Sequence, residues 1–158
     1  MLARLIGSGN NSYLYRALVV DRPLAVSAGA DYSSTSLEST QFWISVFLKP
    51  GVEFVQIEQV IAGVIADVAQ NPICAKDLER VKTQLVAQAV YAQDNQSMLA
   101  RWYGVALTTG LSVEDIQSWP DRIRAVTAEQ VRAAAQKWLD KKRSVTGYLI
   151  KDTTTTKR

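Results

Sequence analysis

The sequence contains no histidine and only one cysteine among its 158 residues. Without histidine, the chain cannot assemble a Ser-His-Asp or Cys-His catalytic arrangement of its own. Zinc sites that contain histidine are excluded for the same reason, and one cysteine is too few for a thiolate-rich site. Any such chemistry would therefore depend on residues outside this sequence.

The cysteine and the acidic residues do not indicate a site either. Cys74 cannot form an internal disulfide, and its apolar surroundings ahead of a predicted helix favour a small buried side chain. The carboxylate pairs Glu53/Glu58 and Asp77/Glu79 fall on predicted helices beside apolar positions, so we expect these side chains to be exposed to solvent. A catalytic pair of carboxylates, as in glycosidases, is an open alternative that no feature of the sequence favours. No acidic segment has the form of a calcium loop.

Charge and hydropathy place few further constraints on function. The net charge is +3, and the basic residues are spread along predicted helix faces, with one tight cluster at 141–143 (KKR). A nucleic-acid site would need a basic stripe with stacking aromatic residues, so we expect no nucleic-acid partner. No apolar run is long enough to cross a bilayer.

A glycine-rich stretch at 7–12 (GSGNNS) has two interpretations. It lacks the later glycine of a dinucleotide-binding fingerprint and the Gly-Lys-Ser/Thr of a P-loop. A turn between helices explains it better, with Gly7 or Gly9 ending one helix and Asn11 or Ser12 beginning the next.

Alternating apolar residues then predict a β-hairpin. The first strand covers 24–32, a Ser/Thr-rich turn covers 33–40, and the second strand covers 42–48. The side chains expected on the buried face are Leu24, Val26, Ala28, Ala30 and Tyr32 of the first strand and Phe42, Ile44, Val46 and Leu48 of the second.

Apolar residues at helical spacing follow the hairpin. We predict a helix over 54–68, a long helix over 76–109 with a bend near 94–96, and a short helix from Ser112 that Pro120 interrupts. A capping box at 127–130 begins the last helix. Its predicted buried residues are Val131, Ala134, Ala135, Trp138 and Leu139.

The order of these elements predicts an α+β fold. A final strand over 145–150 must join the sheet of the hairpin, which gives a two-layer sandwich: a mostly antiparallel sheet with helices packed on one face. We expect one domain over 1–151, truncated at its N-terminus, and a disordered tail over 152–158.

Four segments, taken in chain order, resemble the pitrilysin or insulinase family of zinc peptidases, which includes the mitochondrial processing peptidases. Residues 5–18 (LIGSGNNSYLYRAL) resemble the family's glycine-rich turn and the helix after it, and 24–28 (LAVSA) looks like the next strand. Residues 77–82 (DLERVK) and 123–131 (IRAVTAEQV) are similar to the starts of two later helices. No single motif is decisive, but the ordered set is specific and spans nearly the whole chain.

The resemblance implies a division of labour between two homologous halves that enclose a peptide in a chamber. One half carries His-x-x-Glu-His, where zinc activates water and the glutamate is the general base. This chain would be most of the other half: the non-catalytic C-terminal domain of a zinc-dependent metalloendopeptidase. The implied cofactor is zinc in the parent protein, and this chain itself would bind none. The implied partners are the missing zinc-bearing half, a homologous partner subunit and a peptide substrate. The location is left open, although the resemblance suggests a bacterial parent in the periplasm or cell envelope.

Family members often hold the substrate with an arginine and a tyrosine from this half. Val19 and Val26 align with those positions, which is typical of a zinc-bearing subunit whose partner supplies the pair. We therefore assign no catalytic, substrate-binding or metal-binding residue, and expect Val19 and Val26 in the core.

Two other readings stay open: a scaffold or binding subunit of the same fold, and an unrelated α+β binding module. We also expect this chain to self-associate as a dimer, because a sheet that lacks a strand leaves an edge unpaired.

Overall fold

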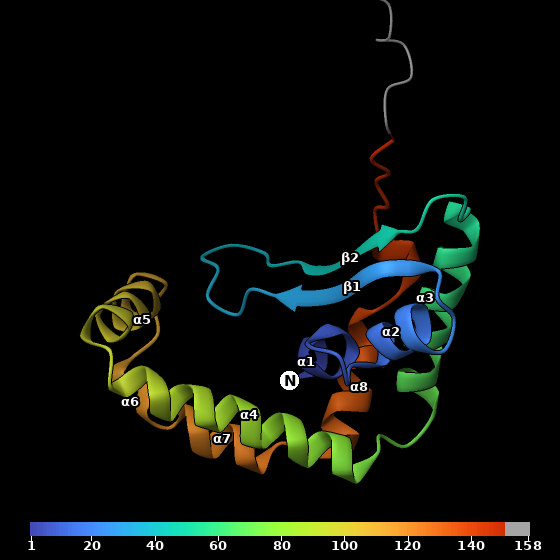
Figure 1. The fold of residues 1–158 in the computed structure, drawn as a ribbon. Helices are drawn as coiled ribbons and strands as arrows, with labels where there is room; N and C mark the ends of the chain where they lie inside the picture. The colour runs from blue at the N-terminus through green and yellow to red at the C-terminus, as the bar shows by residue number, and fades with distance from the viewer. Residues whose placement is uncertain (151–158) are drawn as a thin grey trace, which may run out of the picture.

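The structure is a computed structural model that describes residues 1–150, so the predicted tail at 152–158 lies outside the described residues. The elements, in chain order, are α1 (Leu2–Gly7), α2 (Tyr13–Tyr15), the π-helical turn η1 (Arg16–Val20), β1 (Ala25–Tyr32), β2 (Phe42–Leu48), α3 (Phe54–Gln70), α4 (Ala75–Gln93), α5 (Gln96–Thr108), α6 (Val113–Gln117), α7 (Trp119–Ala125), α8 (Ala128–Trp138) and the 3₁₀ turn η2 (Lys141–Arg143). Figure 1 shows α1, α2, α4, α7 and α8 below the β1–β2 hairpin and α3 beside one end of it. The α+β class is confirmed.

The glycine-rich stretch is a turn between helices, as predicted. α1 ends at Gly7, Gly9 has a φ of +80°, and Ser12 is the N-cap residue of α2. Gly7 also meets β1 at very close range. A Cβ built on Gly7 would lie 1.9 Å from the backbone nitrogen of Ala30. Only glycine allows this approach of helix to strand.

β1 pairs with β2 in antiparallel fashion, and the pairing is interrupted by one irregularity. Ala25 is opposite Leu48 whereas Ser27 is opposite Phe47, so Val26 is the extra residue of a β-bulge. A bulge shifts the alternation of a strand by one residue. Ala25 is therefore buried while Val26 is 63% exposed, and the prediction that Val26 belongs to the core is wrong. Val19, by contrast, is half-buried against the core.

β2 alternates without interruption, as predicted. Phe42, Ile44, Val46 and Leu48 pack against the core, which leaves the odd-numbered positions facing away from the helices. Two of those outward side chains are large and aromatic: Trp43 is 64% exposed and Phe47 is 66% exposed.

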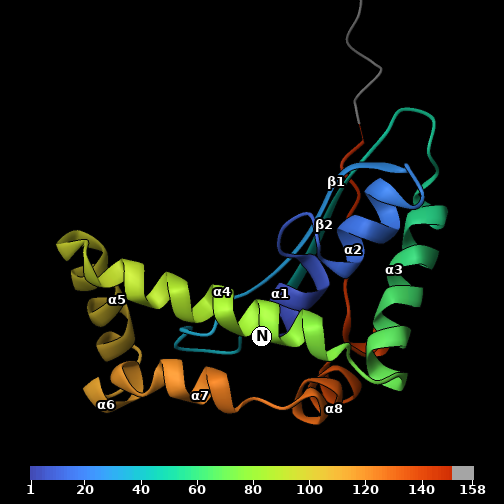
Figure 2. The same ribbon diagram turned by 60° about the horizontal axis from the view of Figure 1, so that its bottom comes forward.

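The helices follow the sequence prediction closely. The predicted bend near 94–96 is a full break between α4 and α5, where the side chain of Asn95 caps α5 by accepting a hydrogen bond from the backbone N–H of Met98. Pro120 stands at the start of α7, the predicted capping box at Thr127 is present, and Ser112 forms another at the start of α6. In Figure 2, α4 and α7 run side by side while α5 crosses their far end.

The core lies between the hairpin, α1, η1, α3, α4 and α8. Its buried members are Leu5, Ile6, Leu14, Leu18, Ala25, Ile57, Val60, Val68, Ile73, Leu78, Val81, Leu85, Val131 and Ala135. Within the described residues, no helix is long and apolar enough to span a membrane.

Three predictions about packing are wrong. Residues 145–150 form no strand, because the sheet in the described part of the chain is the two-stranded hairpin and neither strand pairs with this segment. Trp138, at the end of α8, is 60% exposed. Cys74 is exposed because it is the N-cap of α4, and its neighbour Ile73 fills the core instead.

Candidate functional site

A groove of about 2200 Å³ separates the tip of the hairpin from the helices. Small-molecule pockets measure about 300–1,000 Å³ and carry a few convergent polar groups. This groove is larger, and its walls are mostly apolar side chains of α1, α3, α4 and α8. Its size and lining suit a polypeptide better than a metabolite.

Trp102, Trp119 and Trp138 border this groove from the helices, and its lining also includes Trp43, on the face of β2 that is turned away from them. Trp43 comes from β2, Trp102 from α5, Trp119 from α7 and Trp138 from the end of α8. Trp102 and Trp119 meet edge to face, with ring centroids 6.1 Å apart. Tryptophan is enriched among the side chains that dominate protein–protein binding energy.

Trp138 lines the groove at the end of α8, next to Lys137. The Lys137 ammonium lies 4.9 Å from the centroid of the Trp138 ring, within range of a cation–π interaction. The sequence contained a signal for this position, since Trp138 is the last residue of its helix and a terminal turn is often open to solvent. Helical periodicity alone placed the ring in the core.

One charged cluster joins the C-terminal segment to α3 at the edge of the groove. Tyr148 donates a hydrogen bond to the Glu58 carboxylate, and Lys141 Nζ lies 3.5 Å from Glu58 Oε2. The Tyr148 ring also packs on Phe54, with centroids 4.6 Å apart. The hydrogen bond from Tyr148, followed by that from Lys141, lowers the pKa of Glu58, and the bond to the carboxylate raises the pKa of Tyr148. Glu58 is thus an anchor for the chain after α8.

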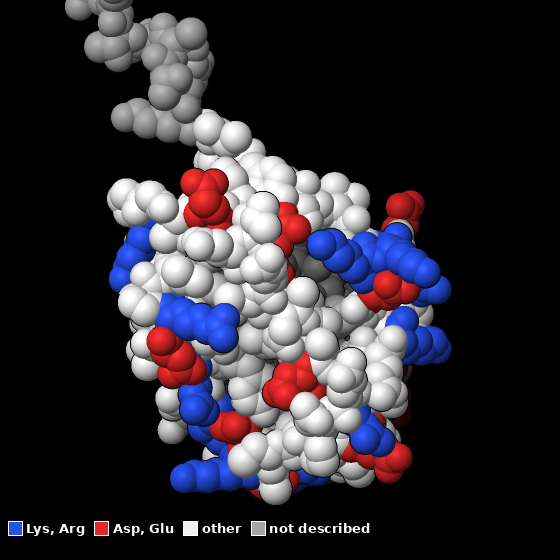
Figure 3. All heavy atoms as spheres, turned by 90° about the vertical axis from the view of Figure 1, so that its right-hand side faces the viewer, with Lys and Arg blue, Asp and Glu red and all other residues white. Residues whose placement is uncertain are grey.

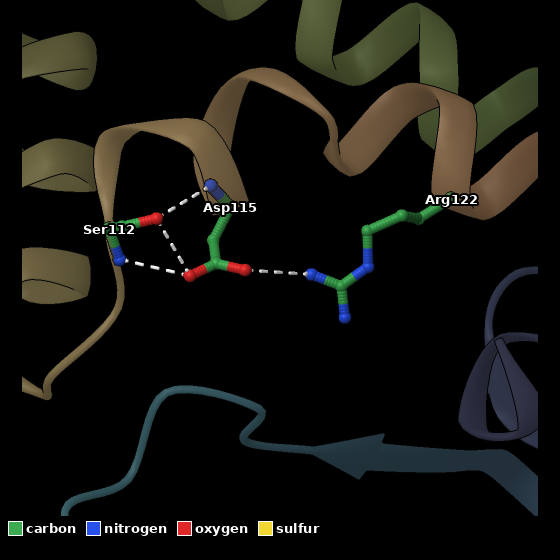
Figure 4. Close-up of polar contacts among 3 residues, drawn as sticks. All are labelled: Ser112, Asp115 and Arg122. Atoms are coloured by element: carbon green, nitrogen blue, oxygen red, sulfur yellow. Dashed lines mark hydrogen bonds and ion pairs between the residues drawn. The ribbon is translucent and has the colours of Figure 1, made fainter.

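A second polar cluster holds α6 against α7, as Figure 4 shows. Asp115 accepts hydrogen bonds from the backbone N–H and the hydroxyl of Ser112, each at 3.0 Å, and Arg122 lies 3.3 Å from its other oxygen. The backbone and side-chain hydrogen bonds from Ser112 lower the pKa of Asp115. All the groups here satisfy one another, so the cluster caps a helix and carries no free reactive group.

Two other acidic residues that the sequence singled out, Asp77 and Glu79, are engaged in local pairs. Asp77 lies 3.2 Å from Arg80, and Glu79 lies 2.8 Å from Lys82, each one helical turn apart. Within residues 1–150, no three or more His, Cys, Asp or Glu side chains come together as a metal site. The described residues therefore offer no set of ligands for zinc.

Arg80 connects two of the segments that carry the family resemblance. Its guanidinium donates a hydrogen bond of 3.2 Å to the backbone carbonyl of Asn11, in the glycine-rich turn. Tyr13, just after that turn, packs near the start of α4, where burial and then Asp77 raise its pKa to about 12. The hydrogen bond therefore ties α4 to the turn that precedes α2.

Charge on the surface is mixed. Figure 3 shows acidic and basic side chains interleaved on the face next to α3. Interleaved signs produce no strong field of one sign over that face.

Comparison with known proteins supports the resemblance. Residues 1–85 match the family described as the Peptidase M16 inactive domain. No protein with curated annotation shows significant similarity to the chain.

Solved structures with the same fold come from several bacteria. The inactive peptidase domain of a Bordetella parapertussis protein, assigned as a zinc protease, has a TM-score of 0.80 at 18% identity, and the match covers 96% of this chain and 82% of that one. A protease from Helicobacter pylori has a TM-score of 0.80 at 16% identity over 88% of this chain. The peptidase M16 inactive domain from Pseudomonas fluorescens has a TM-score of 0.71 at 17% identity over 85% of this chain.

The TM-scores establish a common fold, whereas the lengths of the proteins differ greatly. The match covers 33% of the H. pylori chain and 32% of the P. fluorescens chain, so this chain spans about one third of those two relatives. The family match covers more than half of the chain and the fold agrees over nearly all of it. The chain therefore belongs to the Peptidase M16 inactive domain family.

Proposed function

We propose that this chain is the non-catalytic domain of a zinc-dependent metalloendopeptidase and forms one wall of the chamber that encloses its peptide substrate. The observation that carries the proposal is the outer face of the hairpin. Figure 1 shows helices on one side of β1 and β2 and none on the other. On the bare side, Val26, Trp43 and Phe47 are each more than 60% exposed.

A sheet face that exposes two aromatic side chains suits an unfolded peptide. Aromatic side chains offer large contact areas at little entropic cost and accept many partner sequences. The family membership supports the same role, because a domain without metal ligands contributes binding surface and shape to an enzyme. The zinc, the general base and any homologous partner subunit would lie outside this chain.

The test uses the complete protein in which this domain occurs. We expect its other half to contain His-x-x-Glu-His, and we expect cleavage of an unstructured peptide that a chelator abolishes and zinc restores. Residues 1–158 alone should cleave nothing. A complete protein with no such motif and no zinc-dependent cleavage would overturn the proposal and favour a scaffold subunit of the same fold.

The role of the sheet face is tested separately with Phe47→Ser. We expect an increased KM with little change in kcat, because the side chain contributes to substrate binding and not to the chemical step. Tyr91→Ser is the matched control: Tyr91 is 74% exposed on α4, on the helical side, and its loss should leave KM unchanged. Equal effects of the two variants would count against a chamber wall at the hairpin.

A further inference from the structure

The helices α5 and α6 stand outside the hydrophobic core of the domain. Figures 1 and 2 show them at the end of α4 that is farthest from α3. The core cluster has members in α1, α3, α4 and α8, and Trp119 and Ile123 of α7 pack against it, but within residues 1–150 none comes from α5 or α6. Segments with few buried apolar contacts open at low free energy. We call residues 96–117, which contain both helices, the flap.

The flap has few stabilising contacts of its own. Its buried side chains are Ala106 in α5 and Ile116 in α6. Among the described residues, one ion pair leaves the flap, between Asp115 of α6 and Arg122 of α7, and these side chains are 42% and 64% exposed. Exposed ion pairs contribute little to stability. The flap is therefore attached mainly by its packing against α4 and α7.

The packing between the flap and those two helices is loose. A cleft of about 340 Å³ lies between them, and its lining includes Ala89 of α4, Trp102 of α5 and Pro120 of α7. Well-packed protein interiors contain few voids larger than a water molecule. Beside the cleft, Trp102 contacts Trp119 of α7 edge to face. This aromatic pair is thus a main contact that opening of the flap would break.

The flap is joined to the rest of the chain by a short junction at each end. At its start, α4 ends at Gln93, and the backbone of Asn95 is extended, with a φ of −115° and a ψ of 103°. At its end, Ser118 alone separates α6 from α7. A few residues at the ends of helices are sufficient to absorb the change in φ and ψ of a hinge.

We propose that the flap is a lid that lifts from α4 and α7 as one unit, about these two junctions, while the core stays folded. Met98 and Trp102 of the flap line the groove between the hairpin tip and the helices. Ala89 of α4 lines both the groove and the cleft. Lifting the flap therefore widens the groove at this end. The inference goes beyond the proposed function and does not depend on it.

The first test is hydrogen exchange of residues 1–158, measured by mass spectrometry at several low urea concentrations. We expect the amides of α5 and α6 to share one protection factor, at least about tenfold below those of α4 and α8. Their exchange should also depend less on urea, because lifting the flap exposes less surface than unfolding the domain. Equal protection and equal urea dependence in all four helices would overturn the proposal, since the flap would then open only with the core.

The contact that holds the flap closed is tested with Trp102→Ala. We expect exchange in 96–117 to become about tenfold faster, because the variant removes an aromatic pair that exists only when the flap is closed. Trp138→Ala is the matched control: Trp138 is 60% exposed at the end of α8, and its loss should leave exchange in the flap unchanged. Unchanged exchange in Trp102→Ala, or equal effects of the two variants, would contradict the proposal.

The second test distinguishes lifting of the flap from fraying of α5 alone. Ala89→Cys in a Cys74→Ser background places a thiol on α4 at a position that is 5% exposed and lines the cleft. Ala135→Cys in the same background is the matched control, because Ala135 is 1% exposed in the core. We expect a thiol reagent to label Ala89→Cys at least about tenfold faster, through lifting of the flap. Equal labelling rates would refute the proposal.

Discussion

The close contact between α1 and β1 gives the sharpest test of how this domain is packed. A Cβ at Gly7 would lie 1.9 Å from the backbone nitrogen of Ala30, 2.5 Å from its Cβ and 2.6 Å from its Cα. Backbone atoms of a paired strand cannot move aside as a flexible side chain can. The φ of Gly7 is not positive, so Gly7→Ala tests steric packing alone, without backbone strain.

The magnitude follows from two opposing effects. Alanine is favoured over glycine in a helix by up to about 1 kcal/mol. Overpacking a tight contact costs about 1–3 kcal/mol, and occasionally more. With three strand atoms inside the forbidden distance, we expect the upper end, for a net loss of about 2 kcal/mol or more in the free energy of unfolding. In a domain of this size that lowers Tm by roughly 4–8 °C.

The assay is urea unfolding followed by circular dichroism, with Gly104→Ala as the matched control. Gly104 lies in α5, and a Cβ there meets nothing within 4 Å. We expect that variant to be more stable than wild type by about 0.5–1 kcal/mol. If Gly7→Ala unfolds within about 0.5 kcal/mol of wild type, α1 does not pack on β1 as described.

Three further predictions concern the same region. The Ser12 hydroxyl is fully buried and has no hydrogen-bond partner among residues 1–150, so Ser12→Ala should leave the urea midpoint unchanged or raise it. A loss above about 1 kcal/mol would show that the hydroxyl has a partner. Burial raises the pKa of Tyr13 from 10.0 to about 12, so this residue adds stability below pH 10 that is lost as the pH rises toward 12. Tyr13→Phe should reduce the dependence of the free energy of unfolding on pH between pH 10 and about 12. An unchanged dependence would show that the raised pKa of Tyr13 is not its cause. Arg80→Met removes the hydrogen bond to the Asn11 carbonyl and should lower the free energy of unfolding in urea by about 1 kcal/mol. The control Arg124→Met removes a mostly exposed ion pair and should lower it by less than about 0.5 kcal/mol. Equal losses would contradict a stabilising contact between α4 and the glycine-rich turn.

The local structure can be predicted from the amino-acid sequence, because it depends on residues that are near one another in the chain. The turn at Gly7–Ser12, the break at Asn95 and the capping box at Thr127 each rest on hydrogen bonds or dihedral preferences within a few positions. The absence of histidine determined, without any structure, that this chain cannot hold a histidine zinc site.

Only the tertiary structure decided which apolar residues are buried. Val26 alternates correctly in the sequence, yet the bulge beside Ser27 turns it outward, and a bulge depends on the partner strand. Residues 145–150 have the composition of a strand, but a strand exists only where another edge accepts its hydrogen bonds. The contact between Trp102 and Trp119 likewise depends on how α5 and α7 are placed in space. Periodicity describes a single element, and burial is a property of the pairs of elements that pack together.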